Sequence, residues 1–360
     1  MKRTARILST TLAGGCVLVL LLAAVGAAWQ WSRARADAAR HPPRGQRVAV
    51  GGVHMHLDCR GSGRPLLLLE AGLMSGSSTW MRVHDALART TETCTYDRIG
   101  IGWSDAADAP RTPAAVAARL HALIDRAGKR APYVLVGMSA GGVFVREYYQ
   151  QFPQDVVGMV LVDSSHEQQL AHLPRDDQAE AGIRLLAACT WVQPLGLVRL
   201  LDAMAGSVET APPDPATGPL PAADAVPALI ATMNRSDACA GLHAETGAFL
   251  DALATAPELR DLGSLPLLVL SQDTARPLDP ALLADAALAS REHAQRRAWD
   301  RLQQALAAAS TRGRRKVIAG SGHLIQHDRP QAMIDAVTAF VVTLRNDSDR
   351  VHANGSVLPH

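Results

Sequence analysis

Ser139 lies in the pentapeptide Gly137-Met138-Ser139-Ala140-Gly141, directly after the apolar run Tyr133–Val136. A serine hydroxyl becomes an effective nucleophile only when the chain exposes it, aims it and sets it beside a base. Glycines two residues before and two residues after the serine allow a strand and a helix to approach closely around a strained turn. The next residues, Gly142–Tyr149, have helix-compatible spacing. The pattern therefore predicts a strand–turn–helix nucleophile elbow at Ser139.

His323 is the best candidate among the 13 histidines for the base that such a serine needs. It ends the segment Gly320-Ser321-Gly322-His323, between the last predicted strand, Arg315–Ala319, and a helix that starts near Asp328. Ligands of open parallel sheets bind outside the carboxyl ends of the strands, where this loop is expected. We expect His323 to take the proton of Ser139 during attack and to return it to the leaving group.

A carboxylate must fix the tautomer of this imidazole and stabilise its charged form. Asp273 follows the predicted strand Leu265–Leu270 and gives the chain order Ser, acid, His. Asp163 ends the preceding strand, Val156–Asp163, and could reach the same imidazole from the neighbouring position. We favour Asp273 as the acid, keep Asp163 as its rival and rank Asp279 third.

Acyl transfer also needs hydrogen-bond donors for the oxyanion. We expect one from the backbone N–H of Ala140, directly after the nucleophile, and the other from Leu73 in the loop Glu70–Met74. His327 lies four residues after His323, but no glutamate follows His323 as it does in a zinc-protease helix. We therefore expect neither a metal ion nor an organic cofactor.

Short apolar runs alternate with helical patterns along most of the chain, which predicts an α/β fold. The alternation implies a mostly parallel, doubly wound sheet of about eight strands with helices on both faces. It lapses between Glu167 and Gly263, which we interpret as an inserted helical cap containing a proline-rich loop, Pro212–Pro227. The runs expected to form strands are 46–50, 53–59, 65–70, 94–97, 133–136, 156–163, 265–270 and 315–319.

The first 40 residues predict a membrane segment. Ile7–Ser32 carries no charge and follows three basic residues. As a helix it would span about 39 Å, enough for a hydrocarbon core of roughly 30 Å, and Trp29 and Trp31 fit an interfacial belt. We favour an uncleaved anchor over about residues 7–31, with the lipid bilayer as partner and the catalytic domain in the periplasm or outside the cell. A signal peptide cleaved near Gly26–Ala28, giving a secreted protein, is the alternative.

Composition argues against nucleic acid as a partner. The net charge is +2, aromatic residues make up 4% and the basic residues are scattered, so a basic stripe with stacking aromatics is missing. A chain of 360 residues suits one large α/β domain with an insertion. We divide it into an anchor segment (1–40), a core in two parts (41–166 and 264–345), the cap (167–263) and a flexible tail (346–360).

Four motifs in this order resemble the α/β-hydrolase-fold serine hydrolases, in a bacterial type with an N-terminal anchor. The resemblance covers roughly residues 46 to 345. Its motifs are Glu70-Ala71-Gly72-Leu73, the segment Tyr96–Ser104 with a D-R-x-G-x-G-x-S pattern, the elbow at Ser139, and Gly320–His323. Arg98 is expected to anchor its loop by hydrogen bonds. Glu70-Ala71 stands where the family commonly has His-Gly, which leaves the second oxyanion donor open.

The resemblance implies cleavage of an ester or related acyl bond through an acyl-enzyme on Ser139, with a small, apolar substrate. An acyltransferase on the same triad and a non-catalytic ligand-binding protein are the alternatives. A group of apolar cap residues would either line an acyl pocket or form the core of the cap: Leu186, Trp191, Leu197, Leu200 and Met204.

The resemblance also suggests how the cysteines pair. In the family's sheet order Cys59 and Cys94 lie on neighbouring strands, so we expect them to form a disulfide, and Cys189 to pair with Cys239 inside the cap. Disulfides would agree with an exported protein, whereas buried free thiols would indicate a reducing compartment.

Overall fold

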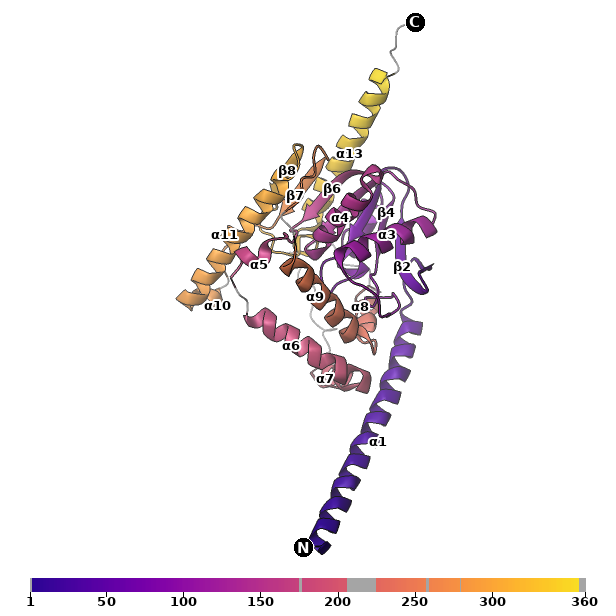
Figure 1. Ribbon diagram of the computed structural model, residues 1–360. Coiled ribbons are helices and arrows are strands. Elements are labelled where there is room, and N and C mark those ends of the chain that lie inside the picture. Colours follow the sequence, from indigo (N-terminus) through magenta and orange to yellow (C-terminus); the bar gives the residue numbers. More distant parts are fainter. Residues whose placement is uncertain (1, 175–176, 206–224, 257–258, 279, 356–360) are drawn as a thin grey trace.

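One eight-stranded sheet forms the centre of the protein in the computed structural model, which describes residues 2–174, 177–205, 225–256, 259–278 and 280–355 (Figure 1). The strand order is β1-β2-β4-β3-β5-β6-β7-β8. β1–β2 and β2–β4 pair antiparallel, and every later pair is parallel. The strands are β1 (Gln46–Val50), β2 (Val53–Arg60), β3 (Leu66–Glu70), β4 (Thr93–Tyr96), β5 (Tyr133–Met138), β6 (Val156–Val162), β7 (Leu267–Ser271) and β8 (Gly313–Val317). The predicted mostly parallel sheet is confirmed.

Helices cover both faces of this sheet. Leu66 and Leu68 of β3 belong to a core with α3 (Pro113–Arg126), α4 (Ala140–Gln151) and α11 (Ala286–Ala308). Leu67 and Leu69 belong to the opposite core, with α2 (His84–Leu87) and α13 (Pro330–Gly355). Successive strand side chains point to opposite faces, so a continuous apolar run such as that of β3 fits a strand buried on both sides. Short helices in the loops are η1 (Ser77–Trp80), η2 (Pro153–Asp155), α5 (Gln169–His172), α10 (Pro280–Leu283) and α12 (Ile325–Asp328).

The inserted cap lies below the sheet in the view of Figure 1. It consists of α6 (Asp177–Val192), η3 (Gln193–Leu195), α7 (Leu197–Ala205), α8 (Ala225–Met233) and α9 (Ala238–Ala254). Both expected disulfides are formed: Cys59–Cys94 joins β2 to β4, and Cys189–Cys239 joins α6 to α9. Of the proline-rich stretch, residues 212–224 lie outside the described residues.

The N-terminal helix α1 (Lys2–Arg40) extends away from the domain (Figure 1). It is long and apolar enough to cross a membrane, and none of its most apolar window is buried in the protein. Near its carboxyl end it packs on the cap: a Cβ added at Gly26 would lie 2.4 Å from the carbonyl oxygen of Leu195 in η3. The Arg199 side chain of α7 forms an ion pair of 2.6 Å with Asp37 of α1.

Residues 346–355, which were expected to belong to a flexible tail, are helical. α13 continues through these residues without a break. Asn346–Asn354 contains neither glycine nor proline. A helix can therefore run on until Gly355.

Candidate active site

Ser139 occupies a strained turn between β5 and α4. Its φ of +52° and ψ of −124° are rare for a residue with a side chain. A Cβ at Gly137 would lie 2.6 Å from the carbonyl oxygen of Gly141, and a Cβ at Gly141 would lie 2.4 Å from that of Glu70. Glycine at both positions is thus required for the turn, and the backbone geometry agrees with the predicted elbow.

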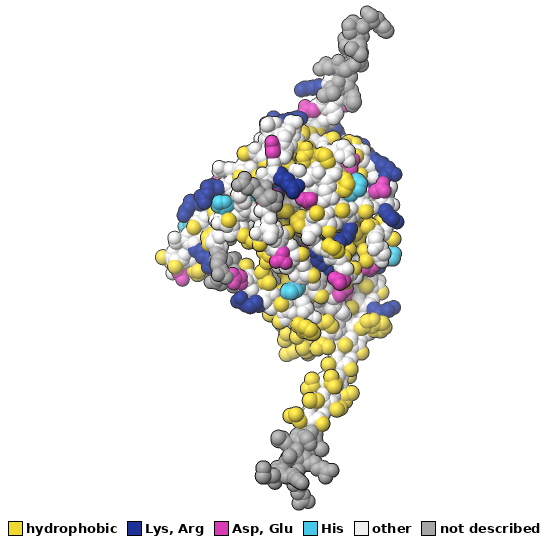
Figure 2. Space-filling view, in the orientation of Figure 1, with side chains coloured by type: hydrophobic (Ala, Val, Ile, Leu, Met, Phe, Trp, Pro, Cys, Tyr) yellow, Lys and Arg dark blue, Asp and Glu magenta, His cyan; other side chains and the backbone are white. Residues whose placement is uncertain are grey.

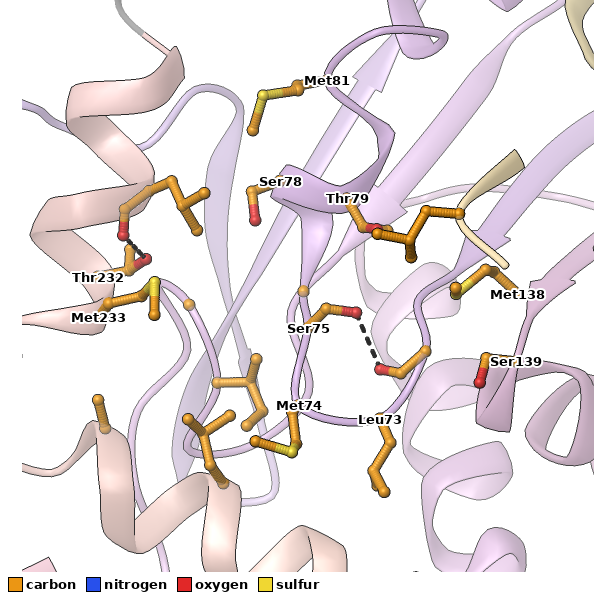
Figure 3. Close-up of a pocket in the computed structure, with 18 of the residues that line it drawn as sticks. Leu73, Met74, Ser75, Ser78, Thr79, Met81, Met138, Ser139, Thr232 and Met233 are labelled. Carbon is orange, nitrogen blue, oxygen red and sulfur yellow. Dashed lines mark hydrogen bonds between the residues drawn. The ribbon is translucent and has the colours of Figure 1, made fainter. Parts of the chain in front are cut away.

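Ser139 and His323 line the same cavity, which has a volume of about 350 Å³. Ser139 enters it from the β5–α4 turn (Figure 3), and His323 from the loop between β8 and α12. Within the described residues no hydrogen bond joins the Ser139 hydroxyl to His323. Such contacts are often long without substrate and tighten in the complex.

The carboxylate that contacts His323 belongs to Asp163, the rival candidate, and not to the favoured Asp273. Asp163 Oδ2 lies 2.7 Å from His323 Nδ1. Asp163 Oδ1 accepts hydrogen bonds of 2.9 Å from the backbone N–H of Gln272 and from Trp299 Nε1. The Asp163 side chain is fully buried, and its backbone has a positive φ of +42°. Two donors, the Gln272 N–H and Trp299 Nε1, therefore hold the Asp163 carboxylate against His323 Nδ1, the arrangement in which Nε2 can serve as the base.

Asp273 supports the histidine loop from outside. Its carboxylate accepts hydrogen bonds from the backbone N–H groups of Gly320, at 2.9 Å, and Ala275, at 3.1 Å. Its own N–H donates to the carbonyl of Ser321 at 3.1 Å. β6 and β7 are neighbours, so both aspartates arrive at the same edge of the sheet, and position alone did not separate them. Asp279, the third candidate, lies outside the described residues.

Two backbone N–H groups lie where an oxyanion could be bound. Ala140 is the first residue of α4, so its N–H has no partner within the helix. Leu73 lies beside Ser139 in the loop after β3 (Figure 3). Neither N–H takes part in a backbone hydrogen bond of the described chain. The loop after β3 passes close to the nucleophile, because a Cβ added at Gly72 would lie 3.2 Å from the Cβ of Ser139.

Arg98 was expected to anchor its own loop, but its side chain instead anchors the Leu73 loop after β3. Its guanidinium donates to the carbonyl oxygens of Ala71, Gly72 and Ser75 at 3.0, 2.8 and 3.0 Å. Burial alone would lower the pKa of Arg98, but the nearby charges of Glu245 and Glu70 raise it, so the group stays protonated. Glu70 therefore has a structural reason to replace the family's usual histidine: it neutralises a buried arginine.

The role of Glu245 was not predicted. This cap residue accepts hydrogen bonds from Arg98 and, at 3.2 Å, from the backbone N–H of Met74. It is 3% exposed, although it belongs to α9 and not to the core domain. The Arg98 loop and the cap are therefore held by one network. The sequence around Glu245, in a segment expected to be helical, gave no signal of this contact.

A second buried pair, outside the lining of the Ser139 cavity, joins the neighbouring loops. His56 Nδ1 lies 2.8 Å from Asp97 Oδ2, and Asp97 also accepts from the backbone N–H groups of Ser77 and Trp103. Burial alone would lower the pKa of His56, but its hydrogen bond to Asp97 and the charge of Asp97 raise it. Burial would raise the pKa of Asp97, but the bond and charge of His56 lower it. The loops after β3 and β4 are thus joined through Asp97, which His56 of β2 contacts.

The cavity wall is mainly apolar. Opposite Ser139 it is formed by α8 and α9 of the cap, with Thr232 and Met233 visible in Figure 3. The apolar members are Leu73, Met74, Met81, Ile101, Met138, Leu229, Met233, Ala238, Leu242 and Leu324. The five cap residues expected to line an acyl pocket are absent from this cavity, and Trp191 and Met204 are 80% and 76% exposed instead of forming a cap core.

Comparison with known proteins points to one fold. Residues 64–183 match the family model described as the alpha/beta hydrolase fold. An AB hydrolase superfamily protein of Gibberella zeae is 32% identical over 29% of this chain and 34% of its own length. An uncharacterized vacuolar membrane protein of Saccharomyces cerevisiae is 38% identical over 30% of this chain and 17% of its own length. The chain thus spans less than half the length of either relative.

Two solved structures resemble the whole domain. A thermophilic esterase from Thermogutta terrifontis is 21% identical, with a TM-score of 0.56 over 83% of this chain and 99% of that chain. A variant of an epoxide hydrolase from Bacillus megaterium is 16% identical, with a TM-score of 0.58 over 82% and 99%. Together with the sheet order and the strained serine turn, these matches show that the chain has the α/β-hydrolase fold.

Proposed function

We propose that this protein is a serine hydrolase that cleaves an ester or related acyl bond. The observation that carries the proposal is the joint placement of Ser139, at a positive φ, and His323, bound to the buried Asp163, on one cavity. A serine at this turn can form an acyl-enzyme, whereas aspartate-dependent epoxide opening would need a carboxylate there.

The reaction follows from these positions. His323 Nε2 takes the proton of the Ser139 hydroxyl while the oxygen attacks the carbonyl carbon of the substrate. The N–H groups of Ala140 and Leu73 stabilise the oxyanion that forms. His323 then protonates the departing alcohol, which leaves the acyl group on Ser139. A water molecule, deprotonated by His323, attacks the acyl-enzyme, and the acid leaves as Ser139 regains its proton.

The cavity defines the substrate class. Its apolar wall and its volume of about 350 Å³ suit an acyl chain of modest size, near the lower end of small-molecule sites. The lining also includes polar side chains such as Ser75, Thr79 and His323. We therefore expect esters with an apolar acyl part to be preferred over charged ones.

Labelling with a fluorophosphonate probe tests the proposed function. The folded wild type should be labelled, and Ser139→Ala should not. His323→Ala should be labelled far more slowly, because the serine loses its base. If folded wild-type protein resists the probe, or if Ser139→Ala is labelled equally, the assignment of Ser139 as nucleophile fails.

We also propose that α1 stays attached as an anchor and that the domain lies outside the cytoplasm. Gln30 Nε2 donates to the Asn234 carbonyl at 2.7 Å and Arg199 pairs with Asp37, so α1 is part of the cap's packing. The two disulfides support an oxidising compartment. The intact mass of protein isolated from membranes with thiols blocked should include residues 1–28 and two disulfides. A mass lacking residues 1–28 would indicate a cleaved signal, and blocked thiols at all five cysteines, Cys16 included, would indicate a reducing compartment.

A further inference from the structure

The apolar face of α7 points away from the protein. Leu197, Leu200, Leu201 and Met204 repeat at the spacing i, i+3, i+4, i+7, which places them along one face of the helix. All four are exposed, Leu201 to 65% and Met204 to 76%. An ordinary surface helix turns such a face toward the core.

The polar face of the same helix points inward. The Arg199 side chain pairs with Asp37 of α1 and donates to the Gln30 side chain at 3.1 Å and to the Asn234 carbonyl at 3.1 Å. Polar contacts therefore hold α7 to the protein while its leucines remain uncovered. The exposed apolar surface continues onto α6, where Trp191 is 80% and Leu185 is 73% exposed.

The anchor shows which surface lies next to this face. If the hydrocarbon core begins at Ile7, where the uncharged run starts, about 20 helical residues bring α1 to the far edge near Gly26. Gly26 is where α1 meets η3, and Trp29 packs on Gly196, the residue that joins η3 to α7. The bend between α6 and α7 therefore lies at the level of the membrane surface.

Figure 2 shows hydrophobic side chains gathered at the end of the domain from which α1 emerges and continuing along α1. α6 and α7 lie at this end, beside α1 (Figure 1). The pair α6–η3 and α7 is also apolar enough, taken together, to pass as a broken or re-entrant membrane segment, bent by 95°. The disulfide between Cys189 and Cys239 fixes this pair to α9 and thus to the domain.

We propose that the cap hairpin, α6–η3–α7, docks into the outer part of the same bilayer that α1 crosses, and that the enzyme takes acyl esters from that bilayer. The second part rests on the proposed function. Docking by an amphipathic helix of this kind buries its apolar face roughly 5–10 Å into the boundary between headgroups and acyl chains.

The cavity adjoins this surface. Met233 lines the cavity of Ser139, and its carbonyl accepts a 2.7 Å hydrogen bond from Gln193 of η3. The next residue, Asn234, is bound by Gln30 of α1 and by Arg199 of α7. One wall of the candidate active site is therefore fastened to the anchor and to the cap hairpin. An amphiphilic ester, with its acyl chain in the bilayer and its acyl bond at the surface, fits this position.

Spin labelling of the full chain in nanodiscs tests the docking. In a Cys16→Ser background, Leu201→Cys carries a nitroxide on the exposed face of α7. Val342→Cys, on α13 and 43% exposed, is the matched control. The Leu201 label should be reached by oxygen in preference to a water-soluble nickel chelate, and the Val342 label should show the reverse. A Leu201 label open to nickel, or shielded from both reagents as a second copy of the chain would shield it, overturns the docking.

Kinetics test where the substrate comes from. The variant Leu201→Gln/Met204→Gln should lose about tenfold in hydrolysis of a long-chain ester dissolved in the nanodisc, corresponding to about 1.4 kcal/mol. Hydrolysis of a short, water-soluble ester should not change. Leu288→Gln, on the exposed side of α11, is the control and should leave both rates intact. Equal loss on both esters, or none on the dissolved ester, contradicts membrane delivery. If the wild type cleaves neither ester, the proposed function fails while the labelling result stands.

Discussion

Replacing Asp163 by asparagine separates the two candidate acids. Asparagine keeps the shape of the side chain and tolerates the positive φ of 42° at this position. Its amide oxygen can still accept the 2.9 Å bonds from Gln272 and Trp299, so the fold should survive. The amide nitrogen would then face His323 Nδ1 as a donor, in place of the oxygen now 2.7 Å away. The imidazole would take the wrong tautomer and lose the charge that stabilises its protonated form.

The expected loss follows from these contacts. We expect Asp163→Asn to lower kcat by about 10,000-fold, the size of this change in serine proteases. That factor corresponds to about 5 kcal/mol of activation free energy. The matched control, Asp273→Asn, can keep one of its hydrogen bonds to Gly320 and Ala275, and we expect less than about a tenfold loss of kcat.

The assay is the steady-state hydrolysis of a short, water-soluble ester by both variants and the wild type, with circular dichroism to verify that each is folded. The active-site geometry predicts that only Asp163→Asn loses orders of magnitude. A large loss in Asp273→Asn together with near-normal turnover in Asp163→Asn would refute the reasoning.

The remaining predictions concern the elements that hold the site. Because the pKa of His56 is raised, its ionic bond to Asp97 contributes fully to stability below pH 6.5, the unfolded pKa, and this contribution is lost as pH rises through the higher folded pKa. The pKa of Asp97 is lowered, so its contribution is present above pH 3.8, the unfolded pKa, and is lost as pH falls through the lower folded pKa. The melting temperature should thus decline above pH 6.5, and the decline should be smaller in His56→Gln; an equal decline in both would contradict the pairing. Arg98→Lys cannot bond three loop carbonyls at once and should lower kcat/KM about 100-fold through a displaced oxyanion donor, whereas unchanged kinetics would show that the loop holds itself. Removing the disulfide between β2 and β4, whose cysteines are 35 residues apart, should cost about 4 kcal/mol of unfolding free energy in denaturant titrations, and a loss below 1 kcal/mol would argue against it.

The sheet was predictable because its strands are continuous apolar runs between turn signals. All eight expected strands are present, and the run of β3 has its side chains buried in two separate cores. The serine turn was predictable for a similar local reason, since its glycines face backbone atoms that any side chain would strike. Local patterns of this kind are compatible with few backbone conformations.

The acid and the cap required tertiary information. Asp163 and Asp273 end neighbouring strands, and the choice depended on Trp299, which donates to Asp163 from a helix 136 residues further along the chain. The exposed leucines of α7 have the spacing of a core-facing helix. The proposal that their face meets a membrane required the position of α1, to which Arg199 binds. Glu245 lacked any local signal, because its partners come from two distant loops.

The most direct test of the central claim is the trapping of the acyl group itself. The full chain is mixed with a water-soluble nitrophenyl ester, quenched in acid within the first turnover and digested for mass spectrometry. We predict an adduct of one acyl group on Ser139, in the peptide that contains the β5–α4 turn, and its absence in Ser139→Ala. Turnover by the wild type with the acyl group on another residue, or continued turnover by Ser139→Ala, would contradict the account.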